Sequence, residues 1–204
     1  MKDNNGVWGV GTYDEIQVLT GMEAIRKRPS MYVGELNSTA MVRLIVESMC
    51  LSRSRACSGE VKEIMLDVEE YGDNNYYVML SDDAPMINDK DEHGMTTLEK
   101  VLEHLYACRE MKTGETAHFC DLGLVVVNAL SKTMLAGCGN ETRKYKSGQL
   151  VEATEINLGV NYEFGLDFEL DPEFFAGVKL DVAELTAAID EVRKTTPADR
   201  KSVV

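Results

Sequence analysis

The sequence predicts an α+β fold, a two-layer sandwich in which helices pack on one face of a mixed, mostly antiparallel sheet. Segments with apolar residues at helical spacing occur beside strand-length runs rich in valine, isoleucine, leucine and tyrosine. A turn rich in glycine and asparagine joins two of those runs, which is typical of a hairpin. The chain has 204 residues with 44% hydrophobic content, which is enough for one substantial core.

The chain divides into an arm, one domain and a tail. We assign residues 1–20 to an N-terminal arm, 21–195 to the domain and 196–204 to a polar tail. Residues 21–28 predict the first helix. Pro29 ends it, because the residue before a proline is disfavoured in helical geometry.

The clearest predicted helix covers residues 40–57. No glycine or proline interrupts it, and Ser38 and Thr39 are candidate N-caps. Its apolar positions keep helical spacing, and they are Met41, Leu44, Ile45, Met49 and Cys50.

Two strands with a hairpin turn follow this helix. The strands cover residues 64–68 and 76–80, and residues 69–75 form the turn. The second strand runs on into residues 81–85, where we expect Pro85 to stop the pairing.

The sequence of the rest of the domain predicts three helices, a polar loop and four more strands. The helices cover 97–106, 120–130 and 182–192, the loop covers 107–118, and the strands cover 135–138, 143–146, 151–158 and 162–170. The predicted core includes Leu44, Ile45, Met49, Val101, Leu105, Val126 and Leu130.

Composition excludes several classes of protein. No eighteen consecutive residues are apolar and the N-terminus lacks the apolar run of a signal peptide, so we expect a cytoplasmic chain that does not engage a membrane. The net charge of -14 opposes direct binding to nucleic acid. The five cysteines show no C-x-x-C spacing, so we expect reduced, mostly buried thiols and no metal site.

Two motifs resemble those of a known family. The segment GMEAIRKRPSMYVG at 21–34 and the segment LGLVVVNAL at 122–130 resemble the N-terminal ATPase domain of DNA gyrase B and of its topoisomerase IV counterpart, in the GHKL superfamily. The resemblance implies a Bergerat-like ATPase fold. It also implies where an ATP site would lie.

The resemblance places Glu47 at the position of the family's water-polarising glutamate, so Glu47 is the candidate catalytic base. The alternative is a solvated or N-capping glutamate on an amphipathic helix. The family's magnesium-binding asparagine follows four residues later, and Leu51 stands there. Leucine offers no oxygen ligand, so we do not expect magnesium.

In the family, an aspartate at a strand end binds the adenine amino group, and glycines follow it. The resemblance assigns Asp82 and Ile87 to that nucleotide-binding motif. Ala84 and Met86 replace its two glycines with Pro85 between them, and a Met86 side chain pointing inward would fill the adenine slot. The alternative for Asp82 is an ordinary acidic turn.

The family's phosphate-binding glycines align with residues 117–123, where only Gly123 survives. Asp121 would place a negative charge near the phosphates, where positive potential is wanted. Lys112 is a candidate phosphate contact, and its alternative is a solvated surface lysine.

Three functional hypotheses follow. The first is a degenerate gyrase B-type GHKL domain that does not hydrolyse ATP, serves as a binding or regulatory module and has no expected cofactor. The second is a functional ATP-binding or ATPase domain of a type II topoisomerase-like protein, which changes DNA topology. The third is a domain that binds a small ligand without phosphate. Comparing ATP, ADP and adenosine as ligands distinguishes the three hypotheses.

The family's N-terminal arm crosses to a second protomer, and Tyr13 lies in the matching segment and is a candidate nucleotide contact. The expected partners are therefore a second copy of the chain or a gyrase or topoisomerase ATPase domain. The resemblance does not extend to the transducer or the strand-passage region of a topoisomerase.

Overall fold

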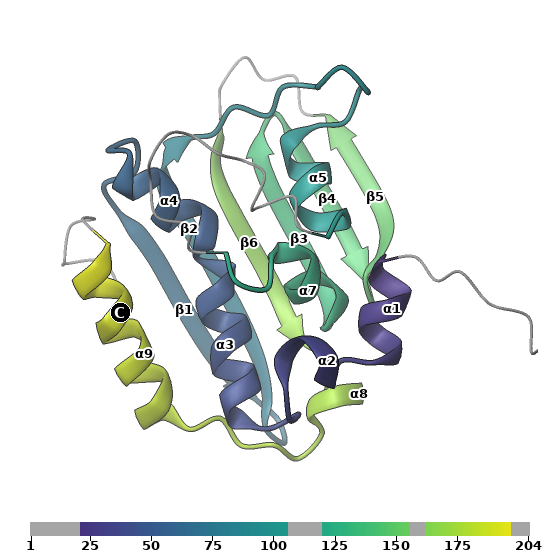
Figure 1. Cartoon of the computed structure of the whole chain (residues 1–204), viewed down its shortest axis with the longest axis vertical. Coiled ribbons are helices and arrows are strands. Elements are labelled where there is room, and N and C mark those ends of the chain that lie inside the picture. Colours follow the sequence, from purple (N-terminus) through teal and green to yellow (C-terminus); the bar gives the residue numbers. More distant parts are fainter. Residues whose placement is uncertain (1–20, 106–119, 156–161, 197–204) are drawn as a thin grey trace, which may run out of the picture.

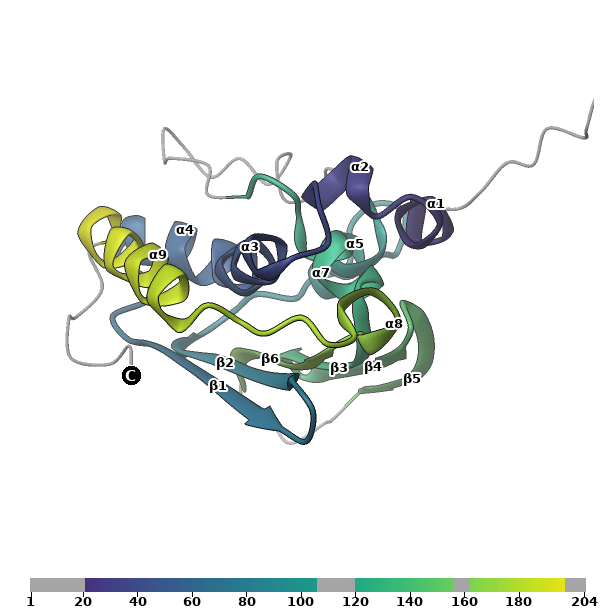
Figure 2. The same ribbon diagram turned by 90° about the horizontal axis from the view of Figure 1, so that it is seen from below.

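A computed structural model describes residues 21–105, 120–155 and 162–196. A six-stranded sheet in the order β1-β2-β6-β3-β4-β5 forms one layer, and each pair of neighbouring strands is antiparallel. The helices all lie on one face of the sheet (Figures 1 and 2). The predicted two-layer α+β fold is confirmed. The predicted arm and the polar loop at 107–118 lie outside the described residues.

The strands form the β1–β2 hairpin, a three-stranded β3–β4–β5 meander and a central strand, β6, that joins the two groups. Their bounds are Ile64–Tyr71 (β1), Asn75–Pro85 (β2), Ser131–Gly139 (β3), Glu141–Lys146 (β4), Gln149–Glu155 (β5) and Tyr162–Leu170 (β6). The last strand in the sequence, β6, pairs with both β2 and β3 and therefore lies in the middle of the sheet.

The helices of the described residues vary from one turn to four. Their bounds are Gly21–Lys27 (α1), Ser30–Val33 (α2), Ser38–Ser48 (α3), Cys50–Cys57 (α4), Thr97–Glu103 (α5), Leu124–Ala129 (α7), Pro172–Phe175 (α8) and Val182–Thr195 (α9). The two single-turn helices, α2 and α8, were not predicted.

The β1–β2 hairpin is longer than its apolar runs indicated. Its turn is confined to residues 72–74, where Gly72 and Asn74 have φ of 58° and 55°. As predicted, the pairing stops at Pro85, the last residue of β2. β2 continues to Pro85, which pairs with Glu163 after a register irregularity, because a proline in a bulged segment need not donate to the ladder.

The predicted helix at 40–57 is two helices, α3 and α4, separated at Met49. The N-cap prediction is also wrong, because Asn37 caps α3 by accepting a hydrogen bond from the Ala40 amide at 3.2 Å. Ser38 instead is the first residue of α3, and its hydroxyl oxygen accepts from the Asp181 amide at 2.7 Å.

The short helix α7 lies at the centre of the helical layer. It contacts α1, α3, α5 and the start of β3, and all of its residues are buried. The predicted helix at 120–130 was too long, because residues 120–123 are not helical. Those residues instead approach Glu47, as described below.

The C-terminal part crosses back over the helical layer. Asp171 caps α8, and α9 continues to Thr195, beyond the predicted end at residue 192. The assigned polar tail begins at Thr196, directly after α9, and residues 197–204 lie outside the described ranges.

The core lies between the helices and the sheet. The predicted core residues are buried except Leu105, which is only partly buried. Cys50, Cys120 and Cys138 are buried and Cys57 is half-buried, as predicted, whereas Cys108 lies outside the described residues. Among the described helices, none has the length and apolar character needed to cross a membrane.

Candidate functional site

Glu47 is buried, and a backbone segment holds its carboxylate. The side chain comes from the last turn of α3 and is 5% exposed. Oε1 accepts a hydrogen bond from the Gly123 amide at 2.8 Å, and Oε2 accepts one from the Asp121 amide at 3.2 Å. The alternative of a solvated glutamate is wrong, because burial of a carboxylate requires such partners.

Gly123 shapes the backbone that receives Glu47. It precedes α7 with φ of 90°, a conformation that L side chains rarely adopt, so glycine is needed there. Its amide points at the carboxylate of Glu47. The Asp121 side chain itself is exposed, while its amide faces inward to Glu47.

Leu51 lies one helical turn beyond Glu47 and is buried in the core. It presents only carbon atoms on the face of α4 where the family would carry an oxygen ligand. The expectation that this position does not bind magnesium stays a prediction.

Asp82 is the second buried carboxylate, and it belongs to the interior of β2. Its Oδ2 accepts from the Ser52 hydroxyl at 2.7 Å, and its two oxygens accept from Arg55 Nη1 at 2.9 and 3.1 Å. The Ala84 amide donates to Oδ1 at 3.3 Å. An ordinary acidic turn is therefore the wrong interpretation of Asp82, which lies in β2. Asp83 also lies in β2, is exposed and accepts from the amides of Lys62 and Glu63.

Arg55 binds the strand end around Asp82. Its Nη2 donates to the carbonyl oxygens of Ala84 at 2.9 Å and Pro85 at 2.8 Å, and its side chain is 11% exposed. Burial raises the pKa of Asp82, while the Ser52 hydrogen bond and the Arg55 charge oppose that rise. The carboxylate of Asp82, which the resemblance assigns to adenine recognition, thus accepts hydrogen bonds from the Arg55 guanidinium at both of its oxygens.

The other predicted nucleotide contacts do not gather with these residues. Met86 is buried, as a slot-filling methionine would be, and its carbonyl oxygen accepts from the Cys138 thiol at 3.8 Å. Ile87 is 76% exposed and joins no cluster around Asp82. Lys112 and Tyr13 lie outside the described residues.

Sequence reasoning missed the partners of Asp82. Ser52 and Arg55 lie three residues apart, so they share one face of α4. That spacing, together with a basic residue in place of the family's acidic ones, was a signal that this face meets a carboxylate.

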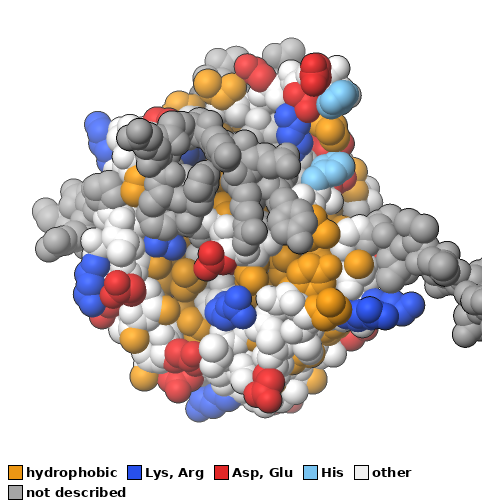
Figure 3. Space-filling model, in the orientation of Figure 1, with side chains coloured by type: hydrophobic (Ala, Val, Ile, Leu, Met, Phe, Trp, Pro, Cys, Tyr) orange, Lys and Arg blue, Asp and Glu red, His pale blue; other side chains and the backbone are white. Residues whose placement is uncertain are grey.

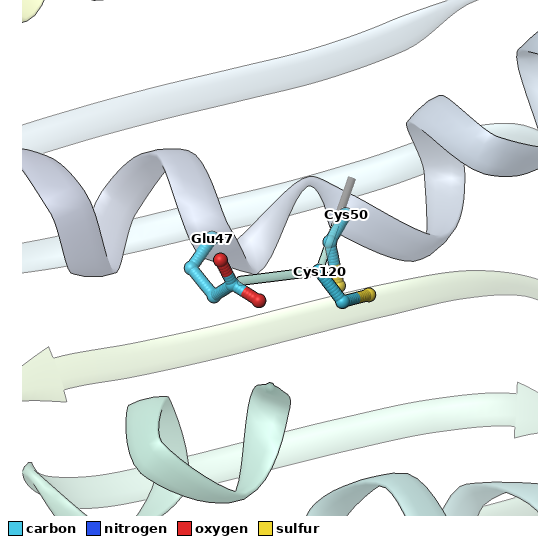
Figure 4. Close-up of side chains that lie close together, drawn as sticks. All are labelled: Glu47, Cys50 and Cys120. Atoms are coloured by element: carbon cyan, nitrogen blue, oxygen red, sulfur yellow. The ribbon is translucent and has the colours of Figure 1, made fainter. Parts of the chain in front are cut away.

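Two cysteines accompany Glu47. The expectation of no metal site rested on the lack of paired spacing along the sequence. The structure nevertheless brings Cys50, at the start of α4, and Cys120, just before Asp121, next to the Glu47 carboxylate (Figure 4). Arg53 lies close enough for the charges of Glu47 and Cys50 to raise its pKa, although burial has the larger effect and lowers it.

The helical face shows charges of both signs. In Figure 3, basic and acidic side chains are interspersed among apolar ones over the described part of this face. The expectation that the chain does not bind nucleic acid directly stays a prediction.

Comparisons with known proteins give one consistent result. No protein-family model matches the chain. The DNA gyrase B protein of Clostridium acetobutylicum is 31% identical over 193 residues, which cover 88% of this chain and 30% of that protein. The corresponding B protein of DNA topoisomerase 4 from Rickettsia typhi is 26% identical over 188 residues, which cover 86% of this chain and 28% of that protein. The chain thus spans less than a third of the length of these curated relatives.

A solved structure has the same fold. The 43K ATPase domain of Thermus thermophilus gyrase B, in complex with an aminocoumarin, matches with a TM-score of 0.62 at 22% identity. The match covers 88% of this chain and 47% of that chain. The six-stranded sheet with helices on one face is therefore the fold of that ATPase domain.

Proposed function

We propose that the chain is a binding or regulatory module of the gyrase B ATPase type that does not hydrolyse ATP. The chain is a homologue of part of DNA gyrase B and of its DNA topoisomerase 4 counterpart, and it has the fold of the gyrase B ATPase domain. The proposal requires that the position assigned to ATP be occupied by the protein's own side chains.

The observation that carries the proposal is the contact between Arg55 and the end of β2. Asp82 would have to accept a hydrogen bond from an adenine amino group, yet Arg55 and Ser52 already satisfy it. Arg55 also occupies the carbonyl oxygens of Ala84 and Pro85. Displacing a guanidinium from a buried carboxylate leaves an unpaired charge, which costs several kcal/mol.

The environment of Glu47 supports the same conclusion. A water-polarising glutamate needs a lone pair directed at the attacking water beside the phosphates. Here both carboxylate oxygens accept amides of the segment that resembles the phosphate cradle, so the backbone holds the carboxylate against that segment. Leu51, buried and without an oxygen atom, stands in place of the family's magnesium ligand.

Thermal unfolding in the presence of nucleotides tests the proposal. A ligand stabilises a protein only by binding its folded state, so magnesium-ATP at millimolar concentration should leave the melting temperature unchanged. The variant Leu51→Asn should be equally unresponsive, because Arg55, Met86 and Asp121 remain. A magnesium-dependent rise of several degrees in the unaltered chain would reject the proposal.

A second candidate function is ATP binding or hydrolysis by a rearranged site. The observation that favours it is that Glu47 and Asp82, the two acidic positions of the resemblance, are both retained and buried. Phosphate release from ATP that disappears in Glu47→Gln but persists in Glu92→Gln would support it. Stabilisation by adenosine without magnesium would instead support the third hypothesis, a ligand without phosphate.

We also propose a partner, either a second copy of the chain or a gyrase-type ATPase domain, bound through the arm at residues 1–20. With no γ-phosphate to lock the contact, self-association should be weak and independent of nucleotide. Sedimentation velocity with and without a non-hydrolysable ATP analogue measures this, with a chain lacking residues 1–20 as the control. Tight dimerisation only with the analogue would favour the ATP-binding alternative.

A further inference from the structure

Glu47, Cys50 and Cys120 form a buried cluster of three potential metal ligands. One carboxylate oxygen and the two sulfur atoms all lie within 4.8 Å of one another. Figure 4 shows the Glu47 side chain extending from its helix toward the two cysteines. Cys50 and Cys120 are 70 residues apart in the sequence, so only the packing of the segment before α7 against the start of α4 brings them together.

The ligand set selects a particular class of metal. Two thiolates and one carboxylate suit Zn²⁺, whereas Mg²⁺ and Ca²⁺ prefer oxygen ligands alone. With Zn–S near 2.3 Å and Zn–O near 2.1 Å, tetrahedral ligand atoms lie about 3.5–3.8 Å apart. The observed upper limit of 4.8 Å therefore needs a contraction of about 1.0–1.3 Å at most, which side-chain rotation can provide.

The carboxylate is oriented before any metal arrives. The amides of Asp121 and Gly123 each donate to one of its oxygens. Outer hydrogen bonds of this kind fix the direction of a ligand and are typical of metal sites in proteins. The same short segment supplies Cys120, so one stretch of backbone positions two of the three ligands.

The charges of the cluster balance when a divalent cation is present. Two thiolates and one carboxylate carry three negative charges, of which zinc neutralises two. The nearby guanidinium of Arg53, which interacts electrostatically with Glu47 and Cys50, offsets the third. A neutral buried assembly avoids the cost of isolated charge in the protein interior.

We propose that Glu47, Cys50 and Cys120 bind one Zn²⁺ ion, with a water molecule or small anion at the fourth position. Each thiol releases its proton to solvent on binding. The ion would tie the α3–α4 junction to the backbone in front of α7. This site is independent of the proposed lack of ATP hydrolysis, although a metal-bound Glu47 would be unable to serve as a base.

Cobalt(II) substitution tests the site directly. The untagged, reduced chain is stripped with a chelator and titrated with Co²⁺, because a polyhistidine tag would bind metal itself. We expect saturation at one equivalent, a thiolate-to-cobalt charge-transfer band of the intensity given by two thiolates, and loss of that band when Zn²⁺ is added. The absence of a charge-transfer band at one equivalent would overturn the proposal.

Matched cysteine variants identify the ligands. Loss of a group that hydrogen-bonds to a metal ligand weakens metal binding about 10–100-fold. Loss of a ligand itself should weaken zinc binding at least as much, and we expect this in both Cys50→Ser and Cys120→Ser. Cys57→Ser, on the same helix but outside the cluster, should bind like the unaltered chain. Glu47→Gln should keep the full charge-transfer band but bind more weakly. Equal affinities in Cys50→Ser and Cys57→Ser would contradict the assignment.

A measurement on the unaltered chain covers the case in which a variant fails to fold. Zn²⁺ should protect Cys50 and Cys120, but not Cys57, from alkylation, as read by mass spectrometry of the peptides. A metal-free chain purified with a Cys50–Cys120 disulfide, which stays oxidised under mild reduction and takes up no zinc, would also overturn the proposal.

Discussion

Two buried carboxylates are stabilised in different ways. Glu47 accepts hydrogen bonds from the backbone amides of Asp121 and Gly123, whereas Asp82 is paired with the positive charge of Arg55. The first arrangement links two segments through hydrogen bonds, and the second is a buried ion pair. Removing either side chain should therefore have distinct consequences.

Glu47→Ala should lower the free energy of unfolding by about 1–3 kcal/mol, because it leaves two amides of the α7 entrance without a partner. Chemical denaturation in the presence of a chelator measures this loss without any contribution from a bound metal. Glu92→Ala is the control, since the Glu92 side chain is 85% exposed and a surface change should stay within about 0.5 kcal/mol. Equal stabilities of the two variants would mean that Glu47 is solvated after all.

Arg55→Met should cost about 3–5 kcal/mol of unfolding free energy, because it strands the Asp82 carboxylate in the interior. The pair Arg55→Met with Asp82→Asn should lose less than the single variant, since no buried charge is left without a partner. Urea unfolding of both variants gives the comparison.

The control for Arg55 is Arg193→Met, which breaks an exposed i,i+3 pair with Asp190 on α9. Such surface pairs contribute about 1 kcal/mol or less. If the losses in Arg55→Met and Arg193→Met were alike, the Arg55–Asp82 pair would have no special structural role.

The elements of the helical layer begin and end where side chains meet backbone groups. Asn37 accepts from the Ala40 amide at the start of α3, and Met49 separates α3 from α4. This break places Cys50 at the first position of a new helix. The break also lets Glu47 and Cys50 face the same neighbouring segment.

Asn37→Ala should destabilise the chain by about 1 kcal/mol, the usual loss of a helix N-cap. Asn37→Ser should keep most of the stability, because serine accepts the same kind of hydrogen bond. Thermal unfolding of both variants checks this prediction. Equal effects of alanine and serine would show that the cap does not stabilise α3.

The whole molecule depends on one core between the two layers, with α7 at its centre. Leu130 ends that helix, is completely buried and lies just before β3. Because the interior of a protein is close-packed and relaxes only in part, truncating a completely buried side chain leaves a cavity.

Leu130→Ala should therefore cost about 2–5 kcal/mol of unfolding free energy. Val182→Ala serves as the control, since Val182 is 67% exposed at the start of α9 and should change stability little. Denaturant midpoints and slopes for both variants measure the difference. A loss below about 1 kcal/mol in Leu130→Ala would contradict the position of Leu130 in the core.

The sequence by itself determined the family, the fold class and most of the elements. Helical spacing and strand-length runs are local patterns, which is why the residues of α3, the β1–β2 hairpin and α9 could be predicted. The errors fell at boundaries, such as Met49 and the cap at Asn37, where side chains and packing decide whether a pattern continues.

Only the tertiary structure decided what the retained acidic residues do. The Gly123 amide that binds Glu47 is 76 residues away, and Arg55 is 27 residues from Asp82. No periodicity extends over such separations, because these contacts form only when the helical layer packs on the sheet. For the same reason, the spacing of Cys50 and Cys120 along the chain gave no sign of the cluster that packing assembles around Glu47.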